Sequence, residues 1–347
     1  MAIETLTAHP PRDAHAILAD THQLLEPALR HAVWGIPPKI RTVVGYHLGW
    51  WDEHHQPTLA ALGKAIRPAL AVLACQAVGG TATQAMPVAV AVEAAHNFSL
   101  LHDDVIDRDA TRRGRPTAWS LFGIPAAILA GDALLTLAHH ALAQTPAPLR
   151  EEGPRYFSQA MWALAEGEYH DCALEQQDQV SIAEVAAMAA GKTGALLSTS
   201  CALGALAGGG DAPRIKALER FGARLGAAFQ YVDDVLGIWG DPRRTGKPAH
   251  SDLYARKKTL PVAFALNSPS AAGRELSNLY CRPGPLEHTA VARVADLVEE
   301  AGGRTWALEQ AEHYHAAALT TLAAADLDAI AVGELAAVAD LVVHRDH

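Results

Sequence analysis

Alanine and leucine fill most segments of this chain between its glycine- and proline-rich turns. Both residues favour helices, whereas alternating runs of valine, isoleucine, threonine and aromatic residues, which favour strands, are missing. Hydrophobic types make up 50% of the residues and aromatic types only 6%. This is enough apolar side chain for a large buried core and too much for a disordered chain. The pattern therefore predicts an all-α protein.

Short breaks divide the sequence at intervals that suit helices. They contain glycine and proline and lie at 36–38, 79–81, 145–154, 208–213, 240–242 and 282–285. Asp211 followed by Pro213 is typical of a helix cap with proline in the first turn, and it predicts a helix that runs to about Trp239. None of the breaks has the composition of a linker, so we expect one helical domain over 1–347, frayed over about 1–12.

The charge balance and the cysteines limit the possible partners and locations. Lys plus Arg number 28 against 38 Asp plus Glu, a formal net charge of -10, which gives no basic field for nucleic acid. The four cysteines form no CxxC pair, so reduced thiols in the cytoplasm are expected. The apolar stretch Pro125–Ala143 contains Asp132, His139 and His140. Because burying such groups in a bilayer is costly, no membrane span is expected.

Three carboxylates, Asp103, Asp104 and Asp107, lie inside an apolar segment of helical character. On a helix, Asp103 and Asp107 are neighbours on one face, one turn apart. Like charges this close repel one another unless a cation compensates them. Hard oxygen ligands at this spacing suit Mg²⁺ that also binds substrate phosphates. The alternative is an acidic face exposed to solvent.

A second acidic pair, Asp233-Asp234, also lies between apolar residues. Each cluster is followed by a basic loop that contains glycine, 112–116 after the first and 243–248 after the second. Carboxylates that hold a metal, set beside guanidinium and ammonium groups, make a site for a polyanion such as diphosphate. A metal alone would not need the arginines.

The order of these motifs resembles that of the trans-type polyprenyl diphosphate synthases, from about Gly63 to the end of the chain. The matching motifs are Gly63-Lys64-x-x-Arg67-Pro68, His96, Asp103-Asp104-x-x-Asp107 with Arg112-Arg113-Gly114, Gly191-Lys192-Thr193, Phe229-Gln230-x-x-Asp233-Asp234, Thr245-Gly246-Lys247-Pro248 and Lys257-Lys258-Thr259-Leu260-Pro261. The resemblance implies a helical bundle of the isoprenoid synthase type with a central active-site cavity. It also implies a prenyltransferase that condenses an allylic diphosphate with isopentenyl diphosphate.

The resemblance also implies a role for each matching residue. Mg²⁺, about three ions with substrate bound, would be held by Asp103, Asp107 and Asp233. Asp104 and Asp234 would act through water or behind the ligands, and the catalytic set is Asp103, Asp104, Asp107, Lys192 and Asp233. The allylic diphosphate would contact Arg112, Lys192, Thr193, Gln230, Lys247 and Lys257. Isopentenyl diphosphate would contact Lys64, Arg67, His96 and Arg113. The alternative for Lys64, Arg67, Arg112 and Arg113, each taken singly, is an ordinary surface charge, and the alternative for His96 is an ordinary core histidine.

Two residues before the first acidic motif bear on the length of the product. Ser99 lies one turn, about 6 Å, before Asp103 on nearly the same face, where a small side chain leaves room. Phe98 is rotated away from that face. This pair resembles enzymes that stop at a C20 chain, so the expected product is geranylgeranyl diphosphate, with farnesyl diphosphate as the alternative.

The chain departs from the family pattern at two positions. Gly237 stands where relatives often have a third aspartate, which predicts weakened metal coordination. Arg256 stands where many relatives have glycine, and the sequence gives no account of its effect.

Two other functions compete with chain elongation. A class I terpene cyclase would use similar metal motifs but would have no need of a second diphosphate site. A non-catalytic subunit of a prenyl synthase would have lost acidic-motif residues, which are retained here. The resemblance implies a homodimer. The 18 histidines, including His54-His55 and His139-His140, show no spacing that assigns a zinc site.

Overall fold

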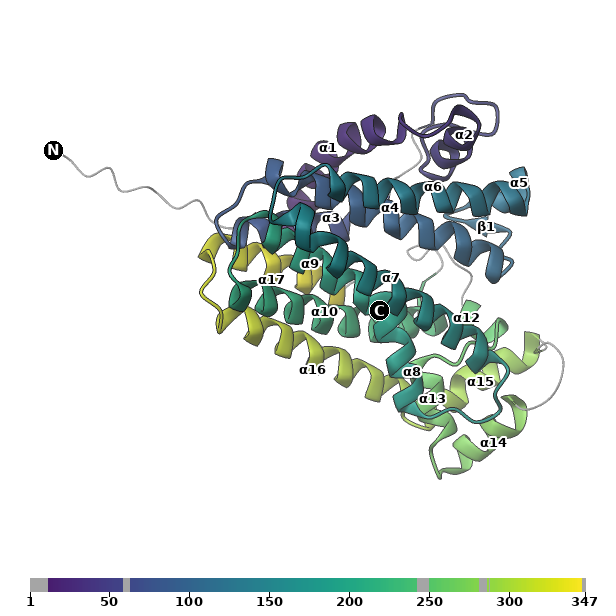
Figure 1. Ribbon diagram of the computed structural model, residues 1–347. Helices are drawn as coiled ribbons and strands as arrows, with labels where there is room; N and C mark the ends of the chain where they lie inside the picture. The colour runs from purple at the N-terminus through teal and green to yellow at the C-terminus, as the bar shows by residue number, and fades with distance from the viewer. Residues whose placement is uncertain (1–11, 59–62, 242–249, 281–285, 287, 345–347) are drawn as a thin grey trace.

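The structure is a computed structural model that describes residues 12–58, 63–241, 250–280, 286 and 288–344. Helices make up nearly all of its regular structure (Figure 1), which confirms the predicted all-α class. Their bounds are α1 Ala14–Val33, α2 Pro38–His47, α3 Ile66–Ala77, α4 Ala82–Ile106, α5 Ala118–Phe122, α6 Ile124–Ala143, α7 Leu149–Glu175, α8 Ile182–Ala189, the π-helix η1 Ala190–Gly194, α9 Ala195–Ala207, α10 Ala212–Trp239, α12 Ser251–Tyr254, α13 Leu260–Leu266, α14 Ala271–Tyr280, α15 His288–Glu300, α16 Gly303–Ala323 and α17 Ala329–Val343. A small hairpin, β1 Thr111–Arg112 and β2 Arg115–Pro116, follows α4.

Local capping residues fix several helix starts. The predicted helix after Asp211 is α10, which ends at Trp239 as expected, and the Asp211 side chain accepts a hydrogen bond from the backbone N–H of Arg214 at 3.0 Å. Capping boxes open α4 and α8. The predicted break over 145–154 is too long, because α7 already begins at Leu149 and Pro154 lies inside it. The expected frayed start and the break at 282–285 fall outside the described residues, except for Arg12.

The long helices pack side by side and bury the main core. Helix α10 lies between α9 and α16, and α3 lies between α9 and α4. This core contains fully buried side chains such as Leu70, Phe157, Leu203 and Phe221. The shorter helices α12 to α15 gather at one end of the long ones (Figure 1) around a second apolar cluster that includes Leu276.

Helix α6 is, among the described residues, the one that is long and apolar enough to cross a membrane by length and composition. One side of it packs against α4, α2 and α7, where Leu134 and Leu142 are fully buried. The polar residues noted in the sequence, Asp132 and His140 among them, lie on exposed positions of the same helix. Its apolar character is therefore accounted for in part by packing within the bundle.

Candidate functional site

The first acidic motif lies at the carboxyl end of α4. Asp103 and Asp104 occupy its last turn, and Asp107 is its C-cap residue. Because the carboxyl end of a helix carries a partial negative charge, carboxylates here need compensating cations. Asp104 is buried, whereas the side chains of Asp103 and Asp107 remain about one-fifth exposed, at 20% and 21%.

The hairpin after α4 supplies the first of these cations. Its turn residues, Arg113 and Gly114, both have positive φ, the backbone that a tight two-residue turn requires. Arg112 Nε donates to Asp104 Oδ1 at 2.6 Å, and Arg112 Nη2 lies 3.3 Å from Asp103 Oδ2. Burial raises the pKa of Asp104 to about 6, although the guanidinium of Arg112 opposes this shift.

The π-helix η1 brings Lys192 into the same cluster. The glycines Gly167 of α7 and Gly191 of η1 touch, so that a Cβ on Gly167 would collide with the backbone of Lys192. This close approach places Lys192 Nζ 3.0 Å from Asp103 Oδ1, 2.9 Å from Glu168 Oε2 and 2.7 Å from Asp171 Oδ2. The carboxylates outweigh the effect of burial and raise the pKa of Lys192, which therefore stays charged.

Lys257, from the segment before α13, closes the cluster. Its Nζ lies 3.1 Å from Asp107 Oδ1, 3.4 Å from Asp171 Oδ2 and 3.1 Å from Glu175 Oε1. Burial acts to raise the pKa of Asp171, but the charges of Lys192 and Lys257 outweigh it and lower that pKa. The sequence analysis missed Glu168, Asp171 and Glu175. Their spacing of three and four residues, one face of α7, is the signal that could have found them.

The second acidic pair lies on α10 and is tied to η1 as well. Thr193 Oγ1 donates to Gln230 Oε1 at 2.6 Å, and Gln230 Nε2 donates to Asp234 Oδ1 at 2.6 Å. Asp234 is buried, and its Oδ2 accepts a hydrogen bond from the backbone N–H of Leu260 at 2.8 Å. Asp233, beside it, is only partly buried. Thus η1 contacts both acidic motifs, through Lys192 and Thr193, while Lys247 lies outside the described residues.

Gly237, the departure from the second motif, faces α12. A Cβ at this position would collide with the carboxylate of Asp252. The space that a third aspartate side chain would need is therefore occupied by a different carboxylate, which reaches it from α12.

A cationic cluster lies near Arg113 of the hairpin. Arg67 of α3 and Arg113 both lie close enough to His96 of α4 for their charges to act on it. Burial, then the charges of Arg67 and Arg113, hold the pKa of His96 well below its usual range, so His96 is neutral at pH 7. Adjacent residues of one hairpin thus take part in the two clusters: Arg112 pairs with Asp104, and Arg113 acts on His96.

Further buried groups support this cationic cluster, and the sequence analysis named none of them. Asn97 Nδ2 donates to Glu93 Oε1 at 3.0 Å, and Glu93 is the carboxylate whose charge acts on both Arg67 and Arg113. His47, at the end of α2, is also held neutral, since burial and the nearby arginines lower its pKa to about 3. Lys64 is exposed and lines a cavity of about 310 Å³ with residues of α1 and α17.

Phe98 and Ser99, the two residues linked to product length, make different contacts. The Phe98 ring packs edge-on against that of His102 with centroids 4.8 Å apart, and His102 in turn contacts Gly131 of α6. Phe98 therefore lies on the α6 side of α4. Ser99 is partly buried, and its hydroxyl donates to the carbonyl of His96 at 2.8 Å.

The acidic cluster offers the oxygen ligands that a divalent cation binds. Its six carboxylates, Asp103, Asp104, Asp107, Glu168, Asp171 and Glu175, meet three cationic side chains. Within the described residues, the buried atoms Asp104 Oδ2 and Glu168 Oε1 have no hydrogen-bond partner. Burial raises the pKa of Glu168, as it does that of Asp104. Uncompensated negative charge on hard oxygen atoms fits a divalent metal ion that carries phosphate ligands.

Comparisons with known proteins agree on one group of enzymes. Residues 49–299 match the family model described as polyprenyl synthetase. A geranylgeranyl diphosphate synthase of Mycobacterium tuberculosis is 45% identical over 321 residues, 92% of this chain and 91% of that protein. A (2E,6E)-farnesyl diphosphate synthase of Mycobacterium bovis is 42% identical over 332 residues, 95% and 92% of the two chains. The crystal structure of a polyprenyl synthetase from Streptomyces coelicolor superimposes with a TM-score of 0.92 at 41% identity, covering 95% of this chain and all of that one.

Proposed function

The chain belongs to the polyprenyl synthetase family and is a prenyltransferase, and on this premise we propose that it joins an allylic prenyl diphosphate to isopentenyl diphosphate to give geranylgeranyl diphosphate. The observation that carries the proposal is the pair of clusters that adjoin the β1–β2 hairpin, one through Arg112 and the other through Arg113. One is rich in carboxylates and suits a metal-bound diphosphate, and the other is cationic and suits a diphosphate directly. Two anion sites fit a reaction with two diphosphate substrates.

We propose that the allylic diphosphate binds at the acidic cluster. Asp103, Asp107 and Asp233 would hold about three Mg²⁺ ions there, and bound Mg²⁺ supplies positive charge that stabilises diphosphate as a leaving group. Arg112, Lys192 and Lys257 would donate hydrogen bonds to the diphosphate oxygens, together with Thr193, Gln230 and Lys247. In the structure the three cations are paired with carboxylates, so they are already held in place. Such preorganised donors favour the separation of charge when the allylic C–O bond breaks.

Isopentenyl diphosphate is assigned to Lys64, Arg67, His96 and Arg113. Because His96 is neutral, it would donate a hydrogen bond from its one ring N–H to a diphosphate oxygen, while the two arginines supply charge. The double bond of isopentenyl diphosphate attacks the allylic cation, a C–C bond forms, and a proton leaves the new cation for the departing diphosphate. Atoms and charge balance without a protein nucleophile.

The exposed apolar face of α6 and α7 supports a homodimer. Ile124 and Leu129 of α6 are 52% and 54% exposed, and Trp162 and Tyr169 of α7 are 73% and 74% exposed. Large exposed apolar side chains on two helices that pack together are typical of a contact surface. Leu129→Glu with Trp162→Glu should give a monomer by sedimentation velocity, and a mass unchanged from the wild type would place the interface elsewhere. A cytoplasmic location is proposed from the cysteines, since Cys75, Cys172 and Cys201 are free thiols.

Product analysis tests the function directly. The purified protein is incubated with Mg²⁺, labelled isopentenyl diphosphate and each of dimethylallyl, geranyl and farnesyl diphosphate, and the dephosphorylated alcohols are sized. A C20 alcohol supports the proposal, and a C15 alcohol keeps elongation but refutes the product. Prenyl diphosphate turned into hydrocarbon without use of isopentenyl diphosphate indicates a terpene cyclase. No turnover of any substrate indicates a non-catalytic subunit.

A further inference from the structure

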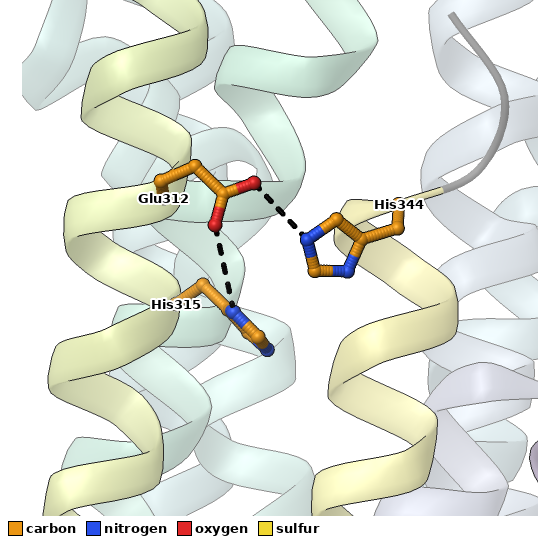
Figure 2. Close-up of side chains that lie close together, drawn as sticks. All are labelled: Glu312, His315 and His344. Atoms are coloured by element: carbon orange, nitrogen blue, oxygen red, sulfur yellow. Dashed lines mark hydrogen bonds and ion pairs between the residues drawn. The ribbon is translucent and has the colours of Figure 1, made fainter.

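A second group of metal-ligating side chains lies on α16 and α17, which carry none of the residues assigned to the two diphosphates. Glu312 and His315 lie one turn apart on α16, and His344 follows the last turn of α17 opposite them (Figure 2). Glu312 Oε1 is 3.0 Å from His344 Nε2, and Glu312 Oε2 is 4.0 Å from His315 Nδ1. One ligand atom from each residue can be chosen so that all three lie within 4.8 Å of one another.

The other nitrogen of each imidazole ring lies close to an oxygen of Asp340, and that of His344 has hydrogen-bond geometry whereas that of His315 does not. His344 Nδ1 is 3.2 Å from the backbone carbonyl oxygen of Asp340, and His315 Nε2 is 2.9 Å from Asp340 Oδ1. A proton on each of these nitrogens leaves a lone pair on His344 Nε2 and on His315 Nδ1, the two atoms that face Glu312. Histidines that bind metals in proteins are oriented by a hydrogen bond to a carboxylate or a carbonyl behind the ring, as the ring of His344 is here.

From this arrangement we propose that Glu312, His315 and His344 bind one Zn²⁺ ion. Two imidazole nitrogens and one carboxylate oxygen suit zinc, whereas Mg²⁺ and Ca²⁺ prefer sites made of oxygen alone. Tetrahedral bonds of about 2.0 Å need ligand atoms roughly 3.3 Å apart. The 3.0 and 4.0 Å separations involve different oxygens of Glu312, and one atom from each residue gives separations within 4.8 Å, so side-chain rotations must draw the three ligand atoms together to close the site.

Exposure on one side and burial on the other fit a site that the ion can reach. The side chains of Glu312 and His344 are 59% and 53% exposed, which gives the ion access and leaves the fourth position to water. The side chain of His315 is only 8% exposed, so its ring is held by packing. A bound ion would fasten the end of α17 to α16. Histidine spacing in the sequence could not reveal this set, because Glu312 and His344 are 32 positions apart.

Zinc titration of the full-length protein without a histidine tag tests the proposal. Excess Mg²⁺ is present throughout, so that the active-site carboxylates are occupied, and a chromophoric chelator reports free Zn²⁺. The wild type should bind one more Zn²⁺ per chain than His344→Gln. The matched control is His313→Gln, which removes a neighbouring histidine of α16 outside the cluster and should bind zinc as the wild type does. Equal zinc binding by His344→Gln and His313→Gln, or none by the wild type, would overturn the proposal.

Two further measurements separate the site from an ordinary surface ion pair between Glu312 and His344. Asp340→Asn, which removes the carboxylate behind His315, should weaken zinc binding about tenfold or more. Zinc should also slow hydrogen exchange of the last amides of α17 in the wild type and in His313→Gln, but not in His344→Gln. Exchange that zinc leaves unchanged in the wild type would contradict the link between the two helices.

Discussion

The carboxylate of Asp252 occupies the space that a side chain at Gly237 would need. From the sequence alone, Gly237 indicates that the second acidic motif has one carboxylate fewer than the family pattern. The structure shows that another carboxylate, carried by α12, stands beside the vacated position. The departure is therefore an exchange of one acidic group for another at the end of α10.

Restoring the family residue should harm this enzyme as long as Asp252 is present. Gly237→Asp introduces a side chain into filled space and a like charge beside Asp252, so we expect a loss of about 1–3 kcal/mol in the free energy of unfolding. Asp252→Ala alone should raise the Mg²⁺ concentration needed for half-maximal activity. The double variant should recover stability, and thermal melts with Mg²⁺ titrations measure both effects. Additive losses in the double variant would show that the two positions do not compete.

Asp103 should be needed for turnover but not for folding. It contacts Lys192 and Arg112, yet Lys192 keeps Glu168 and Asp171, and Arg112 keeps Asp104 when Asp103 is replaced. Asp103→Ala should therefore lower kcat by about 10³-fold or more and shift Tm only slightly. The exposed Asp296→Asn is the control and should match the wild type in both assays. An active Asp103→Ala enzyme would show that the metal site lies elsewhere.

The size of the side chain at position 99 should set the length of the product. Ser99→Phe adds a ring one turn before Asp103, where the growing chain would pass, so the product should shift from C20 to C15. Ser99→Ala keeps a small side chain and should leave the product unchanged. Chromatography of the dephosphorylated alcohols decides the question. A C20 product from Ser99→Phe would mean that other helices form the floor of the cavity.

Local sequence signals predicted the helices and much of the site. Asp211 and Pro213 mark the start of α10 because an N-cap and a proline in the first turn act within a few residues. Lys192 and Thr193 were assigned by motif, and the structure places them against Asp103 and Gln230. These assignments concern residue types at fixed spacings, which a sequence displays directly.

Contacts between distant segments could not be predicted in the same way. Glu168, Asp171 and Glu175 have the spacing of any exposed acidic helix face. In the structure this face is turned toward Lys192 and Lys257, where α7 packs on η1 through Gly167 and Gly191. Pro154 looked like the end of a loop, but α7 contains it. In each case the outcome depends on which helix lies alongside, and a single sequence does not contain that information.

The backbone at Arg256 has a conformation that suits glycine, the residue that the family resemblance leads one to expect there. Its φ of 52° lies in the left-handed region, which costs a side-chain-bearing residue about 1 kcal/mol, while Arg256 Nη1 donates to the carbonyl of Tyr280 at 3.1 Å. Arg256→Ala loses this bond and keeps the strain, so it should be less stable than Arg256→Gly by about 1 kcal/mol. At the exposed helical Glu309 the order should reverse, with Ala more stable than Gly. Chemical denaturation measures the free energy of unfolding of Arg256→Ala, Arg256→Gly, Glu309→Ala and Glu309→Gly. The same order of Ala and Gly at both positions would contradict the prediction.

His47 should make the fold sensitive to acid. Burial, followed by the charges of Arg112 and Arg113, lowers its pKa to about 3, whereas in the unfolded chain the imidazole titrates near 6.5. Between these values the unfolded chain binds a proton that the folded chain does not. The contribution of neutral His47 is thus fully present above pH 6.5 and is lost as the pH falls toward 3.

The expected size of this effect is about 1 kcal/mol per pH unit below 6.5. Replacing His47 with Gln removes the titrating group, so the variant should lose less stability than the wild type between pH 7 and pH 5. His140→Gln, at an exposed position of α6, should keep the wild-type slope. Urea denaturation at several pH values measures all three proteins. If the free energy of unfolding of His47→Gln fell with pH as steeply as that of the wild type, His47 would be protonated, and therefore solvated, in the folded protein.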